Sequence, residues 1–460
     1  VIKEEKATLA ELQALKEENL RATEGVKQIR ADLQALIKEE EEKVEEVDDL
    51  PEGDWHEQLY GGGPTRFGNW SSIPSSMRAD YETLKDDGEE ELEEIRSAFD
   101  YGYLGLGHKV DEFEKELKKF LDANYVVATN TGTSALHIAL LLCGVGKEDE
   151  VVTQSLTFVG TSNAIRYCGA HPVFVDVERE TLGLSPKKLA EFLEENTEVR
   201  DDGLCWNRVS NRIIKVCVPV HNLGHPVRCQ DIQEICAQYH ISVVEDAAES
   251  LGSVSNGVHT GRIGRTGILS FNGNKIITTG GGGMILTDDA LLAEKAKYLT
   301  KQAKDDKIRY FHNEIGYNFR LTNIQAALGV AQLEQLPRFI ERKQDIFNQY
   351  KTAVENIAGL TMTGVPDYAD NNHWMNMLQI DSESYGENME SLMQRLEKNS
   401  IQARPVWGLN HLQKPYMNCQ NYRIKRSEEL VSNSLSLPSS TNISKEDFNN
   451  IIEILTNNVV

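Results

Sequence analysis

The feature that most constrains the fold is a regular alternation of short apolar runs with helical patterns between residues 125 and 287. The apolar runs predict seven strands, at residues 125–130, 151–155, 172–177, 214–220, 241–246, 267–271 and 284–287. Helical patterns lie between the earlier runs, at residues 134–142, 185–195 and 229–239. Such alternation indicates a mainly parallel sheet with helices on both faces. Right-handed crossovers then bring every strand-to-helix loop to one edge of the sheet, where ligands bind.

Residues 1–50 differ in composition from the rest of the chain, with no proline, one glycine and many Glu, Lys, Leu, Ala and Gln residues. Apolar residues recur at heptad spacing from Leu9 onward, which predicts an amphipathic helix. A short imperfect coiled coil and a solvated single helix both stay open, because the acidic run at residues 39–49 opposes tight association.

The remaining chain divides into a linker and two folded domains. Residues 51–77 contain Gly61-Gly62-Gly63-Pro64 and several further Ser and Pro residues, which is typical of a linker. Residues 78–335 contain the alternating strands and helices and form the predicted large domain. Residues 336–460 form a smaller α+β domain, which begins with a long helix after Pro337.

The composition of the chain excludes several classes of function. Its formal charge of −24 repels nucleic-acid phosphates and anionic lipids, so we expect neither nucleic acid nor a membrane as a partner. The seven cysteines show no zinc-type or redox-type spacing, so we expect no metal site and free thiols in a cytoplasmic protein. No apolar run reaches the roughly 18 residues that span a bilayer.

The first motif with chemical content is Asn-Thr-Gly-Thr-Ser-Ala-Leu at residues 130–136, between a predicted strand and a helix. The backbone N–H groups and hydroxyls of Gly132, Thr133 and Ser134 at a helix N-terminus suit a phosphate. A Ser or Thr helix cap uses the same residue types, and for this motif alone the cap is the stronger interpretation.

Two further motifs follow strands. Glu245 and Asp246 end an apolar run, where a carboxylate either pairs with a buried cation or caps a helix. Lys275 lies in a polar turn after the next strand, shortly before four glycines at residues 280–283 that permit close backbone approach. A lone lysine in a turn is usually a solvated surface residue. Beside a phosphate cradle and an isolated acid, however, Lys275 becomes a candidate Schiff-base nucleophile.

In this order, the three motifs resemble those of the pyridoxal-phosphate-dependent nucleotide-sugar aminotransferases of the DegT/StrS type. Further matching stretches lie at residues 102–107, 155–158, 220–224, 316–322 and 404–407. By pattern the chain is most similar to the 4-keto-sugar aminotransferases of the bacillosamine and legionaminic acid routes, which the insertion at residues 196–212 also fits. The resemblance implies an α/β fold of the fold type I class. Its parts are a mainly parallel seven-stranded sheet and a smaller C-terminal α+β domain, to which this chain adds an N-terminal helical extension.

The resemblance also implies pyridoxal 5′-phosphate as the cofactor and gives the motif residues roles. Lys275 holds the cofactor as a Schiff base and, once the amino donor has displaced it, moves a proton as base and then as acid. Asp246 keeps the pyridine nitrogen protonated, and Phe158 stacks on the ring. The residues implied to hold the phosphate are Gly132, Thr133 and Ser270. Asn318 is implied to reach the phosphate bound by a partner subunit, so we expect a homodimer with shared active sites.

The implied reaction moves an amino group from glutamate to a nucleotide-linked 4-keto-6-deoxy sugar, with a 2-acetamido hexose favoured, for amino-sugar and glycan biosynthesis. The residues in stretches that border the sugar site are Tyr103, His221, Arg404 and His411. For each, a structural role is an equal alternative: His411 as a loop cap, for example, or Arg404 in a surface ion pair. The residues leave open whether the nucleotide is UDP or GDP and whether C4 or C3 is aminated.

Three positions test the resemblance. Glu249 stands where many relatives have Gln, beside the phenolic oxygen of the cofactor, so we expect its carboxyl to be protonated or turned toward the substrate. Gly281 replaces a Glu that is common in the family, which removes one polar contact. Lys275 opposes the reading as a sugar dehydratase, because the dehydratases of the family have His at this position.

Two non-enzymatic hypotheses stay open beside the aminotransferase. One is a scaffold or regulator that keeps the fold and the cofactor without turnover, and the other is an assembly protein that acts through its N-terminal helix. The intact Lys275, Asp246 and phosphate cradle favour the enzyme, because a scaffold has little physical need for all three.

Overall fold

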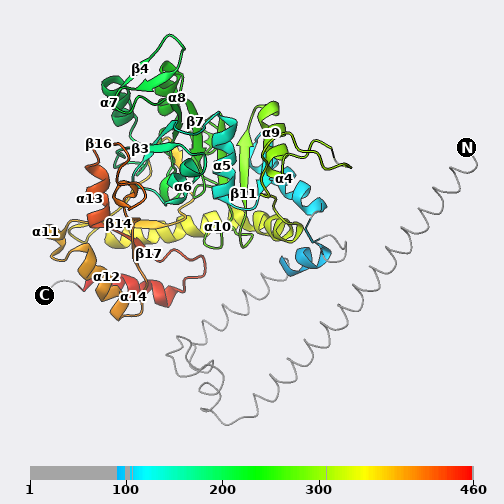
Figure 1. The fold of residues 1–460 in the computed structure, drawn as a ribbon. Helices are drawn as coiled ribbons and strands as arrows, with labels where there is room; N and C mark the ends of the chain where they lie inside the picture. The colour runs from blue at the N-terminus through cyan, green and yellow to red at the C-terminus, as the bar shows by residue number, and fades with distance from the viewer. Residues whose placement is uncertain (1–90, 99–103, 106, 307, 458–460) are drawn as a thin grey trace, which may run out of the picture. The chain divides into compact units, whose positions relative to one another are not determined.

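The computed structural model describes residues 91–98, 104–105, 107–306 and 308–457, so the predicted helix at 1–50 and linker at 51–77 lie outside the described residues. A large sheet lies between layers of helices (Figure 1). In spatial order its strands are β1 (Tyr125–Thr129), β11 (Gly283–Thr287), β10 (Thr266–Ser270), β7 (Ser242–Asp246), β6 (Ile214–Val218), β2 (Glu150–Gln154), β3 (His171–Val175) and β16 (Asn421–Tyr422).

All seven predicted strands are present, each within about two residues of its predicted ends. The sheet has an eighth strand, β16, which the sequence did not predict because its two residues are too short to show a pattern. Neighbouring strands are parallel from β10 to β16, whereas β11 runs antiparallel to both β10 and β1. The carboxyl ends of β1, β10, β7, β6 and β2 therefore meet at one edge.

Helices cover both faces of this sheet because alternate strand residues point to opposite sides. Val127 of β1 belongs to the core that α5, α6 and α9 close, while its neighbours Val126 and Ala128 pack with α4 and α10. Helices α7 and α8 close that second face further along the sheet. The helices are α4 (His108–Leu121), α5 (Gly132–Leu142), α6 (Gly160–Tyr167), α7 (Pro186–Asn196), α8 (Cys229–Gln238), α9 (Ala290–Thr300), α10 (Asn323–Val354), α11 (Ser382–Tyr385), α12 (Met389–Lys398), α13 (Arg426–Asn433) and α14 (Lys445–Thr456).

The C-terminal segment forms a second sheet with its own core. In spatial order its strands are β12 (Leu360–Met362), β14 (Asn376–Ile380), β17 (Ser434–Leu437) and β15 (Arg404–Pro405), each antiparallel to its neighbours. Helices α12 and α14 and the last turns of α10 pack on it. Short elements complete the fold: the pair β4 (Thr197–Val199) and β5 (Cys205–Asn207) in the insertion, and the small sheet of β13 (Ala369–Asp370), β8 (Val254–Ser255) and β9 (Val258–His259).

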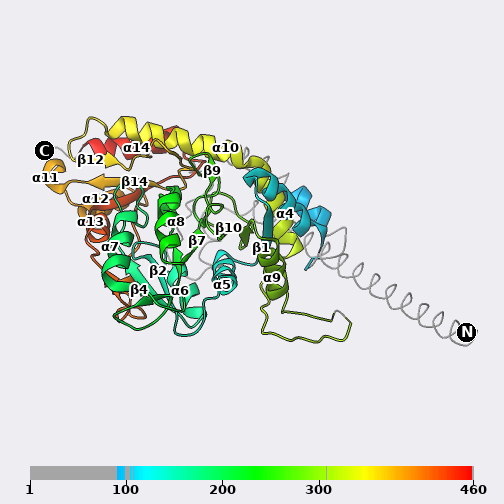
Figure 2. The same ribbon diagram turned by 90° about the horizontal axis from the view of Figure 1, so that it is seen from above.

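Helix α10 carries the chain from the large sheet to the second sheet. Helix α10 has 32 residues, and Figure 2 shows it running along the molecule from α4 to α14. The long helix that we expected after Pro337 instead begins at Asn323, where Thr322 and Gln325 form a capping box. Pro337 lies inside the helix, although its nitrogen has no hydrogen to donate to the preceding turn. The predicted domain boundary at 335/336 thus falls within one continuous helix.

The structure also bears on two expectations from the sequence, which concern membrane-spanning helices and disulfide bonds. Within the described residues, every helix is too short or too polar to cross a bilayer. All seven cysteines lie in the described part of the chain, and none of them forms a disulfide.

Candidate active site

The carboxyl ends of the parallel strands border a cavity of about 570 Å³. The predicted site residues that line it are Gly132, Thr133, Phe158, Asp246, Glu249, Ser270 and Lys275. They come from the segments that follow β1, β2, β7 and β10, or from the last residues of those strands. The topology collects them because these strands all end at the same edge of the sheet.

The start of α5 has the geometry of a phosphate cradle. Thr131 is its N-cap, and the Thr131 hydroxyl accepts the N–H of Ser134 at 3.0 Å. Gly132 and Thr133 follow in the first turn, where backbone N–H groups have no acceptor within the helix. A Cβ on Gly132 would lie 2.7 Å from Cβ of Ser270, so glycine is what lets the end of β10 approach these N–H groups. The Thr131 cap is therefore present, and the next two residues have backbone N–H groups without an acceptor in the helix.

Asp246, the last residue of β7, is a buried acid at the cavity wall. The Thr161 hydroxyl donates to its Oδ2 at 2.7 Å, and the Ala248 N–H donates to its Oδ1 at 3.2 Å. Burial raises the pKa of Asp246, against the opposing effects of the Thr161 hydroxyl, the Ala248 N–H and the charge of Lys275. A carboxyl in this position favours a cationic partner in the cavity.

Lys275 lies in the turn after β10, and its side chain is only 11% exposed. Its Nζ is 3.4 Å from Oε1 of Glu249 and 4.2 Å from the ring centre of Trp374. The other carboxyl oxygen of Glu249 accepts the N–H of Leu223 at 2.9 Å. Burial raises the pKa of Glu249, although the charge of Lys275 and the Leu223 N–H lower it, and this direction favours the protonated carboxyl.

Thr161, Trp407 and Trp374 are among the residues that line the cavity but were not predicted as site residues. Thr161, in the first turn of α6, donates to Asp246, and no sequence pattern distinguishes it from other threonines. Trp407 lies in the stretch 404–407 that contributed to the family resemblance, so that stretch was the available signal. Trp374 precedes β14 and is far from Lys275 in the sequence, and it follows a polar run that gives no functional signal.

His221 does not line the cavity. Its ring is fully buried, and Nδ1 accepts the N–H of Val227 at 3.1 Å. The proton is therefore on Nε2, which donates to Oε2 of Glu245 at 3.0 Å. Burial alone would raise the pKa of Glu245, but this bond and those from the backbone N–H groups of Gly264 and Gly261 lower it. Both ring nitrogens of His221 are thus used inside the protein, and the predicted contact with the sugar finds no support here.

His411, Arg404 and Asn318 also do not line the cavity. Nδ1 of His411 is 2.6 Å from the hydroxyl of Ser155, and the His411 N–H donates to the same oxygen, which matches the loop-cap alternative. Arg404 is exposed at the start of β15, and Asn318 is exposed before α10. Tyr103 lies outside the described residues.

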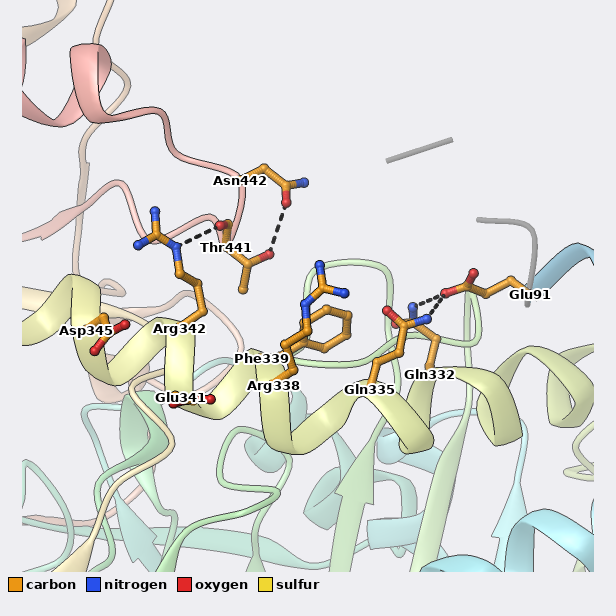
Figure 3. A pocket seen from close by; sticks show the side chains of 10 residues that line it. All are labelled: Glu91, Gln332, Gln335, Arg338, Phe339, Glu341, Arg342, Asp345, Thr441 and Asn442. Carbon is orange, nitrogen blue, oxygen red and sulfur yellow. Dashed lines mark hydrogen bonds between the residues drawn. The ribbon is translucent and has the colours of Figure 1, made fainter. Parts of the chain in front are cut away.

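A second hollow, of about 680 Å³, lies on the outer side of α10 (Figure 3). Glu91 accepts the side-chain amides of Gln332 and Gln335 there, each at 2.9 Å, and Arg342 donates to the carbonyl of Thr441. None of the predicted site residues that the structure describes lines this hollow. The predicted site residues that the structure brings together thus line the cavity at the strand edge and not this hollow.

Comparison with known proteins gives one answer. Residues 85–456 match the profile of the DegT/DnrJ/EryC1/StrS aminotransferase family. EpsN of Bacillus subtilis (strain 168) is 37% identical over 368 residues, which cover 78% of this chain and 91% of EpsN. GDP-perosamine synthase of Caulobacter vibrioides is 32% identical over 351 residues, which cover 76% of this chain and 90% of that protein. A solved DegT DnrJ EryC1 StrS aminotransferase from Brucella abortus has a TM-score of 0.73 at 26% identity, covering 82% of this chain and 97% of that one. The cavity, the fold and the sequence thus agree: the chain belongs to the DegT/DnrJ/EryC1/StrS aminotransferase family.

Proposed function

We propose that this pyridoxal-phosphate-dependent aminotransferase moves the amino group of glutamate to the keto carbon of a nucleotide-linked 4-keto-6-deoxy sugar. A 2-acetamido hexose is the favoured substrate, and the product serves amino-sugar and glycan biosynthesis. The observation that carries the proposal is the single cavity that Lys275, Asp246 and the start of α5 share. The similarity to GDP-perosamine synthase supports a nucleotide-linked acceptor, and the similarity to EpsN extends over most of both chains.

The residues of the cavity fit pyridoxal phosphate in three ways. The first turn of α5 offers N–H groups to a phosphate, and the missing Cβ of Gly132 leaves room beside Ser270. Asp246 is a buried acid that suits the pyridine nitrogen, and the half-exposed ring of Phe158 offers an apolar face. Lys275 presents an amine to the same space.

Each of these residues has a chemical task in the proposed reaction. When bound, pyridoxal phosphate takes up the amino group of the donor and accepts the electron pair that a departing proton leaves behind. Lys275 first holds the cofactor. As a free amine, it then takes the proton from Cα of glutamate as a base and later gives this proton back as an acid. Asp246 keeps a positive charge next to its carboxylate, and Thr161 and Ala248 hold that carboxylate in place. The Glu249 carboxyl, when protonated, donates a hydrogen bond to the phenolic oxygen.

We also propose that the enzyme is a homodimer in the cytoplasm. Asn318 is exposed and does not line the cavity of its own chain, so it is free to face the phosphate site of a second copy. The loop before it exposes the large side chains of Tyr310, Phe311 and Ile315, which a subunit contact would cover. The unpaired cysteines support a reducing compartment.

The first experiment follows the visible absorbance of the bound cofactor in the full-length protein. Lys275→Ala is expected to abolish the band of the covalently held cofactor. Lys187→Ala, at an exposed position of α7, is the matched control and should keep it. Wild-type protein that is folded but shows no band with excess cofactor would overturn the proposal.

A second experiment identifies the acceptor. Enzyme that carries the amino form of the cofactor is mixed with UDP- or GDP-linked 4-keto and 3-keto sugars, and the return of the aldehyde band is followed. We expect a 4-keto-6-deoxy sugar to restore the band. Return with 3-keto sugars alone would make the enzyme a 3-keto aminotransferase, and no return with any sugar would favour a scaffold or regulator.

A further inference from the structure

None of the predicted roles falls on Trp374, yet its ring lies against the reactive amine. Nζ of Lys275 is 4.2 Å from the centre of the Trp374 ring, and both residues line the cavity. An ammonium within about 6 Å of a tryptophan ring centre is attracted by the electron-rich face of the ring, most strongly where water is excluded. Trp374 is 4% exposed and the Lys275 side chain is 11% exposed, so water is largely excluded from this pair.

The position of the Trp374 ring is fixed by hydrogen bonds at both ends of the residue. Its ring N–H donates to the carbonyl of Asn274 at 2.7 Å, and its backbone N–H donates to the side chain of Asn372 at 2.9 Å. Its carbonyl accepts from Nζ of Lys343 and from the hydroxyl of Ser439, each at 3.0 Å. The ring is thus held next to the turn that carries Lys275.

The same loop also anchors the second partner of the amine. The side-chain amide of Asn372 donates to the carbonyls of Glu249 and Leu251, at 3.0 and 2.9 Å. Glu249 is the residue whose carboxyl lies 3.4 Å from Nζ of Lys275. The segment before β14 therefore contains Trp374 and holds the backbone of Glu249, the two residues beside the lysine amine.

We propose that Trp374 is a catalytic residue, whose ring face stabilises the amine of Lys275 while that amine carries the proton of the amino donor. This inference rests on the proposed role of Lys275. In that step the Cα–H bond of glutamate breaks and an N–H bond forms on Nζ, which makes the amine a cation. The electron pair passes to the cofactor, and Nζ later gives the proton back. The ring is positioned to stabilise the cation between these two events.

Two substitutions separate the ring from its other contacts. Trp374→Phe keeps an aromatic face, whereas Trp374→Met fills similar space without one, and both lose the hydrogen bond to Asn274. The difference between them therefore reports the ring face. Trp407→Met is the matched control, because Trp407 lines the same cavity while, among the described residues, no cation lies over its ring.

The first measurement uses the cofactor-free protein and involves no turnover. Trace acetylation with acetic anhydride modifies neutral amines only, and mass spectrometry gives the labelling of Lys275 relative to the exposed Lys187. We expect Trp374→Met to raise this ratio about fivefold, since the amine is no longer held against the ring face. Trp374→Phe should raise it by less than half as much, and Trp407→Met should leave it unchanged. An equal rise in Trp374→Met and Trp407→Met would overturn the inference, because general opening of the cavity would then explain the labelling.

The second measurement uses the loaded enzyme. Trp374→Met should keep the visible cofactor band while the glutamate half-reaction slows about tenfold, with little change in KM for glutamate. An intact band with wild-type rates would sink the role of Trp374 and leave the proposed function standing. A missing band in the wild type would instead remove the proposed function itself. If neither variant folds, fluorinated tryptophan at position 374 keeps the shape and weakens the ring face, and the same labelling ratio applies.

Discussion

Gly132 and Ser270 approach each other so closely that a Cβ at position 132 would lie 2.7 Å from Cβ of Ser270. Gly132→Ala therefore forces apart the start of α5 and the end of β10, at the predicted phosphate cradle. We expect the variant to lose about 1–3 kcal/mol of stability through overpacking and to bind pyridoxal phosphate more weakly. Urea denaturation and titration of the cofactor band measure the two effects. Gly364→Ala is the control, since nothing lies within 4 Å of a Cβ there, and an unchanged cofactor affinity in Gly132→Ala would contradict the cradle.

Asp246→Asn should separate activity from stability. Burial raises the pKa of Asp246 above its ordinary value of 3.8, so the folded cofactor-free protein binds this proton more tightly than the unfolded chain does. The contribution of Asp246 to stability therefore falls as the pH rises from 3.8 through the folded-state pKa. We expect Asp246→Asn to equal or exceed the stability of the wild type at pH 7 without cofactor, while amino transfer drops at least about 100-fold.

Asp176→Asn is the matched control for that prediction. The carboxylate of Asp176 accepts backbone N–H groups from Lys425, Arg426 and Ser427, so the same change should destabilise the protein at neutral pH. Thermal unfolding with and without cofactor distinguishes the two sites. A loss of stability in cofactor-free Asp246→Asn as large as in Asp176→Asn would show that Asp246 is structural.

His221→Ala should act on folding rather than on sugar binding. It removes the hydrogen bond from Nε2 of His221 to the buried carboxylate of Glu245, which costs about 1–3 kcal/mol. Because bonds from His221 and the backbone lower the pKa of Glu245 below 4.5, the stability from this group is present above pH 4.5 and lost as the pH falls further. The variant should lose less stability with acid than the wild type does. Urea denaturation from pH 3 to 7 tests this, and a large change in KM for the sugar with normal stability would restore the substrate role.

We expect Lys343 to make the free energy of unfolding increase with pH in the alkaline range. Burial lowers the pKa of Lys343 from 10.5 to about 8, although its Nζ donates to the carbonyls of Trp374 and Ser439. Between these values the unfolded chain binds more protons than the folded protein, so the free energy of unfolding increases with pH. Lys343→Met removes this contribution. We expect the free energy of unfolding of the wild type, minus that of the variant, to increase from pH 8 to pH 10. A difference that does not change with pH would contradict a lowered pKa of Lys343.

The strands and their ligand edge could be predicted from the sequence because each strand is a short apolar run between polar turns. The direction of a single side chain at that edge is harder to predict. Glu245 and Asp246 are adjacent, yet Asp246 lines the cavity while Glu245 bonds to His221 on the other side. Val220 lines the cavity and His221 does not, for the same reason: successive side chains along an extended strand point in opposite directions. The register that decides between them is a property of the folded sheet.

Contacts between residues that are distant in the chain could not be predicted from the sequence either. Trp374 contacts Lys275 because the segment before β14 packs against the large sheet. No local pattern around residue 374 predicts this long-range contact. The beginning of α10 was also misplaced, since Pro337 usually marks a helix start or end, whereas here packing on both sheets keeps the helix continuous.

Because α10 is continuous, it restricts where residues can be inserted into or deleted from this chain. One residue added to the helix would turn everything after it by about 100° and advance it by about 1.5 Å. The last turns of α10 pack on the second sheet, so such a change would oppose either that packing or the hydrogen bonds that hold Trp374 beside Lys275. Insertions in hairpins such as β4–β5 leave that geometry untouched. The packing of α10 on both sheets thus restricts the number of residues that this helix can have.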